Sequence, residues 1–111
     1  MADSDKLILL ARADGVQPDA ALRVELPGRA PIALFRLGDQ YFATDDTCTH
    51  GAASLSEGDI SDGQVECPFH SGSFDIRTGK PTALPCTKAL DVHPVTLENG
   101  CVYMRMPSDR E

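Results

Sequence analysis

Several features that common protein classes need are missing from this sequence. It has no tryptophan, and aromatic residues make up only 5% of its 111 residues. No apolar stretch approaches the length of a membrane span, and the run at residues 7–11 is too short for the core of a signal peptide. No glycine-rich dinucleotide fingerprint is present, so we do not expect the chain to bind NADH itself. These absences favour a single small domain in the cytoplasm.

Positive charge is also scarce, with 10 Lys and Arg against 17 Asp and Glu and a net charge of -7. Nucleic-acid binding usually requires a basic patch, so we expect no nucleic acid and no anionic membrane surface as a partner. Residues 45–80 hold seven acids and two bases, and therefore carry -5 of the total charge. This acidity either steers the chain toward basic partner proteins or only aids solubility.

Short alternating strands separated by turns dominate the pattern, with 17 Gly and Pro in total. Residues 6–12 are apolar enough for a buried strand. Residues 19–26 offer a helix starting at Pro18, but their alternation and the stop at Pro27 favour a strand. Further strands are expected at residues 32–37, 40–44, 64–66, 73–76, 89–93, 95–98 and 101–106. The fold class is therefore all-β, built from antiparallel sheets.

The middle of the chain differs from its flanks because glycine and proline recur there and strand signals become short. A loop-rich insertion in a compact domain is usually functional. We therefore expect a base scaffold formed by residues 1–44 and 87–111, and a site-bearing subdomain over residues 45–86.

Two Cys-His pairs lie in this segment, Cys48-Thr49-His50 and Cys67-Pro68-Phe69-His70. Each pair offers one thiolate and one imidazole, which together can hold a [2Fe-2S] cluster with Cys on one iron and His on the other. Two Cys and two His are also a standard zinc set. Zinc knuckles usually pair Cys with Cys and His with His, so the mixed pairs favour iron–sulfur and leave zinc as the alternative.

The loop sequences, Cys48-Thr49-His50-Gly51 and the run from Cys67 through Ser71-Gly72-Ser73-Phe74-Asp75, resemble the cluster-binding loops of Rieske proteins. They are most similar to the Rieske-type ferredoxins of bacterial aromatic-ring-hydroxylating dioxygenase systems. The resemblance implies the Rieske fold and one [2Fe-2S] cluster. It also implies that Cys48 and Cys67 bind one iron and that His50 and His70 bind the other.

The resemblance further implies a one-electron carrier rather than an enzyme. Beyond His50 and His70 only His93 remains, which is too few histidines for the catalytic iron of an oxygenase. The carrier would take electrons from a flavin-dependent NAD(P)H reductase and pass them to a terminal Rieske oxygenase, as a diffusing monomer. The alternative is a Rieske-type small subunit of another redox enzyme, such as an assimilatory nitrite reductase.

Four positions depart from the high-potential respiratory Rieske proteins. Ala53 and Phe69 replace two disulfide-forming cysteines, and Gly72 and Phe74 replace Ser and Tyr hydroxyls that donate hydrogen bonds to cluster sulfurs. Losing such donors destabilises the reduced state. The substitutions predict a potential at the low end, about -150 mV, of a family range of roughly -150 to +300 mV.

Further residues near the motif also have expected roles. Phe69, Pro68 and a turn at residues 81–85 are expected to cover the cluster. Ser71 and Ser73 either donate to a sulfide or cap turns, and His93 is expected to be a surface or packing residue. The acids that are candidates for steering partners are Glu57, Asp59, Asp62 and Glu66.

The other two cysteines, Cys86 and Cys101, have no histidine partner at ligand spacing. We expect both to be free thiols, because a cytoplasmic location disfavours a disulfide between them.

Overall fold

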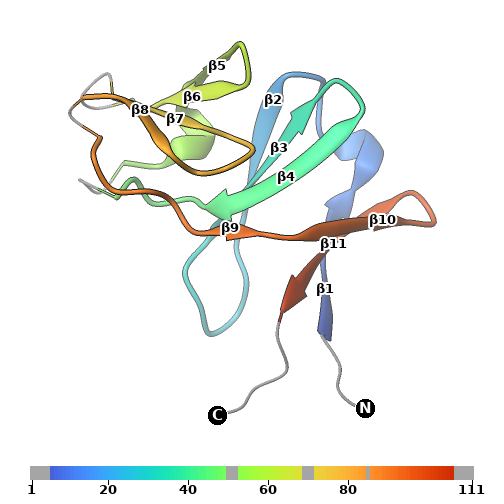
Figure 1. The fold of residues 1–111 in the computed structure, drawn as a ribbon. Coiled ribbons are helices and arrows are strands. Elements are labelled where there is room, and N and C mark those ends of the chain that lie inside the picture. Colours follow the sequence, from blue (N-terminus) through green and yellow to red (C-terminus); the bar gives the residue numbers. More distant parts are fainter. Residues whose placement is uncertain (1–5, 50–52, 69–71, 85, 107–111) are drawn as a thin grey trace.

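The computed structural model describes residues 6–49, 53–68, 72–84 and 86–106 (Figure 1). This part of the chain forms three antiparallel sheets and two short 3₁₀ helices, η1 (Ala13–Gly15) and η2 (Leu55–Glu57). The predicted all-β class is confirmed. Within the same residues, no helix is long and apolar enough to cross a membrane.

The strands are distributed over the three sheets as follows. The first sheet has the order β1 (Lys6–Arg12), β11 (Cys101–Met106), β10 (Val95–Glu98). The second has the order β2 (Ala20–Val24), β3 (Ile32–Leu37), β4 (Gln40–Asp45), β9 (Val92–His93). The third is a meander of β5 (Asp59–Ser61), β6 (Gln64–Glu66), β7 (Ser73–Asp75) and β8 (Pro81–Ala83). Figure 1 shows the third sheet at one end of the molecule and the β10–β11 hairpin at another.

Strand β3 separates two hydrophobic cores because both of its faces are buried. Alternate residues of a strand point to opposite faces, so Ala33, Phe35 and Leu37 pack into one core, and Ile32 and Leu34 pack into the other. The first core includes Leu55 of η2 and apolar residues of the third sheet and its flanks: Val65, Phe74, Ile76 and Leu90. The second core lies between the first two sheets: Leu10, Val24, Ile32, Leu34, Ala43, Val102 and Met104.

The strand expected at residues 6–12 is confirmed as β1, but its predicted burial is wrong. Leu7 is 44% exposed and Leu9 is 54% exposed, whereas Leu10 is buried. β1 is an edge strand that pairs only with β11 among the described strands, and one of its faces has no layer packed over it. The apolar composition of the run gave no indication of its position at the edge.

The middle segment is more regular than its composition predicted, because it contains two additional strands, β5 and β8. The β5–β6 hairpin turns at Asp62 (φ 54°) and Gly63 (φ 76°), the left-handed pair that a two-residue hairpin turn requires. Conversely, the strand expected at residues 89–93 is confined to Val92–His93. The strand expected within residues 19–26 is confirmed, since β2 pairs with β3 along its whole length.

Because β3 lies between the two cores, we expect its buried side chains to contribute more to the free energy of unfolding than exposed side chains of other strands. Leu34→Ala should lower the free energy of unfolding by about 2–5 kcal/mol, because it leaves a cavity beside a fully buried strand. Leu97→Ala, at an exposed position on β10, is the matched control and should change it by less than about 0.5 kcal/mol. Urea unfolding followed by circular dichroism measures both, and equal effects would contradict the central role of β3.

Candidate metal centre

Cys48 and Cys67 are the two predicted ligands that the structure describes, and both are buried in the first core. Their exposed fractions are 3% and 1%, and both belong to the same cluster of packed residues as Phe35. The other two predicted ligands, His50 and His70, lie outside the described residues. Because cysteine is often buried as an ordinary small apolar residue, burial alone does not identify a metal site, and the local backbone carries the argument.

The two cysteine loops are closed in the same way. The backbone N–H of Cys48 donates to the carbonyl of Ala53 at 3.0 Å, and the N–H of Cys67 donates to the carbonyl of Gly72 at 2.6 Å. Each loop is bracketed by an antiparallel pair, Thr47 with Ser54 in the first and Glu66 with Ser73 in the second. Each cysteine is therefore the first residue of a closed loop of the same length, the arrangement that two matched ligand loops require.

Asp46 fixes the first loop to the helix that follows it. Its buried carboxylate accepts hydrogen bonds from the hydroxyl of Ser54 and, at 2.9 Å, from the backbone N–H of Ser56. Its carbonyl accepts the N–H of Leu55 at 2.7 Å. Burying a carboxylate is tolerable because these donors satisfy it. Asp46 thus holds both ends of the Cys48 loop in register, and it is not a surface charge available to a partner.

Asp45 and His93 form a second polar contact at the base of this loop. The Nε2 of His93 lies 2.8 Å from the Oδ1 of Asp45, and Arg29 donates to the same oxygen at 3.2 Å. The backbone N–H of Asp45 donates to the carbonyl of Asp91 at 3.0 Å. His93 is therefore engaged in structural contacts that join β4 to the β9 region.

The segment after β8 is tied to the site from two directions. The hydroxyl of Thr49, next to Cys48, donates to the carbonyl of Lys88 at 2.8 Å. The N–H of Leu90 donates to the carbonyl of Gly79 at 2.8 Å, in the turn between β7 and β8. These contacts hold residues 86–90 against both halves of the site.

Cys86 is the residue that the sequence analysis failed to connect with the site. It is 2% exposed and packs in the same core as Cys48 and Cys67. Burial raises the pKa of the Cys86 thiol above its ordinary value. All four cysteines are free thiols in the structure. Neither spacing nor a neighbouring histidine indicated the proximity of Cys86 to Cys48.

Gly72 is required by a close approach. A Cβ atom at this position would overlap the sulfur of Cys86 and lie 2.9 Å from its backbone nitrogen. From the sequence, Gly72 is a position that has lost a hydroxyl; in the structure no side chain fits there while Cys86 is in place. The neighbouring strand residue Phe74 is fully buried.

The structure changes the roles expected for Ser73 and for the turn at residues 81–85. Thr82 donates to Gln64 at 2.9 Å, which leaves the hydroxyl of Ser73 to donate to Thr82 at 2.7 Å. Ser73 is therefore engaged across the sheet rather than with a sulfide. Residues 81–83 form β8 rather than the expected turn, and Pro68 is exposed. Ser71 and Phe69 lie outside the described residues.

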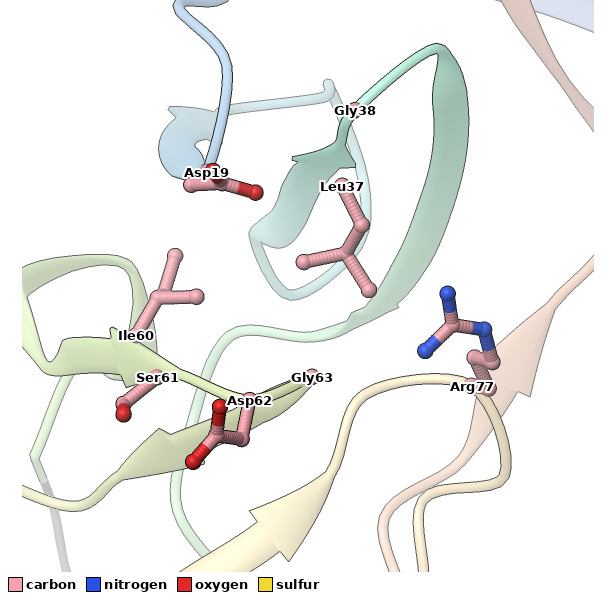
Figure 2. Close-up of a pocket in the computed structure, with 8 residues that line it drawn as sticks. All are labelled: Asp19, Leu37, Gly38, Ile60, Ser61, Asp62, Gly63 and Arg77. Carbon is pink, nitrogen blue, oxygen red and sulfur yellow. The ribbon is translucent and has the colours of Figure 1, made fainter.

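The surface beside Cys67 is acidic. Glu57, Asp59 and Glu66 line a hollow of about 290 Å³ together with Cys67 and Pro68, and all three acids are exposed. A larger hollow of about 520 Å³ lies between the β3–β4 turn and the β5–β6 hairpin (Figure 2). Its polar side chains are those of Asp19, Ser61, Asp62 and Arg77, and no cysteine lines it. The hollow beside Cys67 is therefore the one that adjoins the predicted ligands.

The crowding at Gly72 predicts a large effect from a small substitution. Gly72→Ala should lower the free energy of unfolding by about 1–3 kcal/mol, because the added methyl overlaps Cys86 and displaces the closed loop. Gly15→Ala is the control, since a Cβ there meets no atom within 4 Å. Thermal unfolding compares the two, and a Gly72→Ala protein as stable as Gly15→Ala would show that the approach is not tight.

Comparison with known proteins agrees with the ligand pattern. Residues 6–94 match the Rieske [2Fe-2S] domain family. Ferredoxin CarAc of Metapseudomonas resinovorans is 50% identical over 92 residues, covering 83% of this chain and 86% of the relative. The ferredoxin component of the p-cumate 2,3-dioxygenase system of Pseudomonas putida is 45% identical over 103 residues, covering 92% and 87%.

A solved structure shows the same fold. It is the complex of reduced oxygenase and oxidized ferredoxin in carbazole 1,9a-dioxygenase, in which the matched chain is 45% identical with a TM-score of 0.87, covering 95% of this chain and 97% of that one. The buried thiols of Cys48 and Cys67 fit the thiolate half of a Rieske cluster, which these relatives favour over zinc. The chain belongs to the Rieske [2Fe-2S] family, among the ferredoxin components of aromatic-ring dioxygenase systems, with one Rieske-type cluster as its cofactor.

Proposed function

We propose that the chain is a non-catalytic carrier that moves one electron at a time from a flavin-dependent NAD(P)H reductase to the terminal oxygenase of an aromatic-ring dioxygenase system. The observation that carries this proposal is the similarity, over nearly the whole chain, to ferredoxin components of such systems. The similar ferredoxin solved together with its oxygenase supports the oxygenase as a partner. The reductase is inferred from the need for an electron donor.

The proposed ligands are Cys48, His50, Cys67 and His70, with the cysteines on one iron and the histidines on the other. A Rieske cluster bound there supplies reversible one-electron redox chemistry. The chain contributes two buried thiolates, each fixed by a closed loop. Their burial keeps water from the sulfur side of the site. We also propose that residues 45–86 act as the cluster-binding subdomain on a base of residues 1–44 and 87–111.

The proposed potential is low for the family. Phe74 has no hydroxyl and its ring is fully buried in the first core, and Gly72 leaves no room for a side chain. Neither position can donate a side-chain hydrogen bond to a cluster sulfur, so the reduced, more negative state receives less stabilisation.

The surface near the site suits brief encounters. Glu57, Asp59 and Glu66 are exposed beside Cys67, where they would attract a basic partner surface from a distance. Leu84 is 78% exposed and lies two residues before Cys86, so it offers an apolar contact once the partner arrives. Exposed acids that attract the partner and a small apolar contact favour fast association and fast release. We propose that the carrier acts as a monomer in the cytoplasm, where its cysteines stay reduced.

A redox titration monitored by electron paramagnetic resonance tests the proposed cluster and its potential together. The dithionite-reduced protein should give the spectrum of a mixed Cys and His cluster, with a midpoint of about -150 mV. A clearly positive midpoint would contradict the low-potential assignment. A colourless protein containing stoichiometric zinc would contradict the function as a whole.

Stopped-flow reduction by the flavin reductase of a dioxygenase system tests the steering role. The rate should fall as salt rises, since the Debye length shortens to about 10 Å at 0.1 M. The double variant Glu57→Gln, Glu66→Gln should be slower by on the order of threefold to tenfold at low ionic strength. Glu98→Gln, on an exposed position of β10, removes one charge outside this acidic surface and is the control, which should react at the wild-type rate. Rates that ignore both salt and these substitutions would show that the acids serve solubility alone.

A further inference from the structure

The side chain of Thr49 leaves the Cys48 loop and contacts a distant segment of the chain. Thr49 lies between two of the proposed ligands, Cys48 and His50. Its hydroxyl donates a hydrogen bond of 2.8 Å to the carbonyl of Lys88, 39 residues further along the chain. This hydrogen bond is exposed to solvent, so water could satisfy both groups in its place. The contact is therefore not needed to compensate a buried polar group, and what it provides is a connection between two segments.

The acceptor lies in the middle of a short bridge, residues 86–90, whose two ends are buried. Cys86 is 2% exposed and Leu90 is 4% exposed, and both pack in the first core. The three residues between them are exposed. The backbone N–H of Cys86 donates to the carbonyl of Ala83 at 3.2 Å, which fixes the chain as it enters the bridge. The carbonyl that Thr49 binds is therefore anchored from both sides.

Both ends of the bridge lie against glycines in the half of the site that carries the Cys67 loop. A Cβ atom at Gly72, whose carbonyl closes that loop, would overlap the sulfur of Cys86. A Cβ atom at Gly79, in the turn between β7 and β8, would lie 2.5 Å from the carbonyl oxygen of Leu90. The backbone N–H of Leu90 donates to the carbonyl of Gly79 at 2.8 Å. These close approaches leave the bridge no room to shift toward either glycine.

The bridge therefore connects the two ligand loops. Thr49 extends from the Cys48 loop to the middle of the bridge, and one end of the bridge rests on the glycine that closes the Cys67 loop. The backbone hydrogen bond that closes each loop acts within that loop. The contact of Thr49 acts between the loops, because it joins the first of them to a segment seated on the second.

We propose that Thr49 is a positioning residue, whose hydroxyl holds the Cys48 loop in a fixed place relative to the Cys67 loop through the carbonyl of Lys88. The inference rests on the proposed ligand roles of Cys48 and His50. The peptide units on the two sides of Thr49 lead directly to these residues. A restrained Thr49 limits how far both ligands can move, as residues that orient metal ligands from behind do in other sites.

Three variants of the cluster-containing protein test this role. Thr49→Val keeps the shape of the side chain and loses the hydroxyl, whereas Thr49→Ser keeps the hydroxyl and loses the methyl group. Thr82→Val is the matched control. It also removes an exposed hydroxyl, but the partners of that hydroxyl, Gln64 and Ser73, both lie in the third sheet.

Two measurements compare the variants. Pulsed electron paramagnetic resonance of the reduced protein measures the couplings of the histidine nitrogens, and Thr49→Val should broaden or shift them, because a loosened loop samples more geometries of His50. Loss of iron to an excess of chelator should be about threefold to tenfold faster in Thr49→Val, the factor expected for one neutral hydrogen bond. Thr49→Ser and Thr82→Val should match the wild type in both measurements.

The spectra separate failure of this inference from failure of the proposed function. If the wild type shows no histidine nitrogen couplings, the ligand assignment itself is wrong. If they are present but Thr49→Val keeps them unchanged, the hydroxyl has no positioning role. Equal changes in Thr49→Val and Thr49→Ser would assign the effect to packing of the methyl group, and would overturn the inference as well. Should Thr49→Val fail to assemble, Thr49→Ser decides alone: wild-type couplings and iron loss support the role of the hydroxyl, and altered ones contradict it.

Discussion

Two backbone hydrogen bonds, one across each cysteine loop, determine how the rest of the site is arranged. They place Cys48 and Cys67 at equivalent positions in loops of equal length, and both cysteines pack on the same face of β3. The carbonyl of Gly72 closes the second loop, so this residue cannot move without opening it. Its missing side chain in turn makes room for the sulfur of Cys86. The ligand sulfurs and the third thiol are therefore set by backbone geometry more than by side-chain choice.

Strand β3 separates this site from the remainder of the protein. One of its faces forms the core that contains the three buried cysteines, and its other face forms a core with the first sheet. Changes in the second core can alter stability without touching the ligand loops.

The acids near the site form two groups, one structural and one exposed. Asp45 and Asp46 are used in structural hydrogen bonds, whereas Glu57, Asp59 and Glu66 remain at the surface.

The sequence was sufficient wherever the signal is local. The Cys-His pairs together with the loop sequences around them indicated the family, and the strand pattern located β2, β3, β4, β10 and β11. Features that depend on how distant segments pack together could not be predicted from the sequence. The exposure of Leu7 and Leu9 follows from the uncovered face of β1, and β5 and β8 have three residues each, too few for alternation to show. The Asp62-Gly63 turn was the available clue to β5. Cys86 could not be linked to Cys48, because only the return of the chain after β8 brings them together.

The central claim is that cysteines hold one iron of the cluster and histidines hold the other. Mössbauer spectroscopy of the reduced protein, grown with isotopically enriched iron, tests it most directly. We predict two inequivalent irons, a ferric site with sulfur ligands alone and a ferrous site with nitrogen ligands. Two irons that both show all-sulfur coordination, or a protein without iron, would contradict the account.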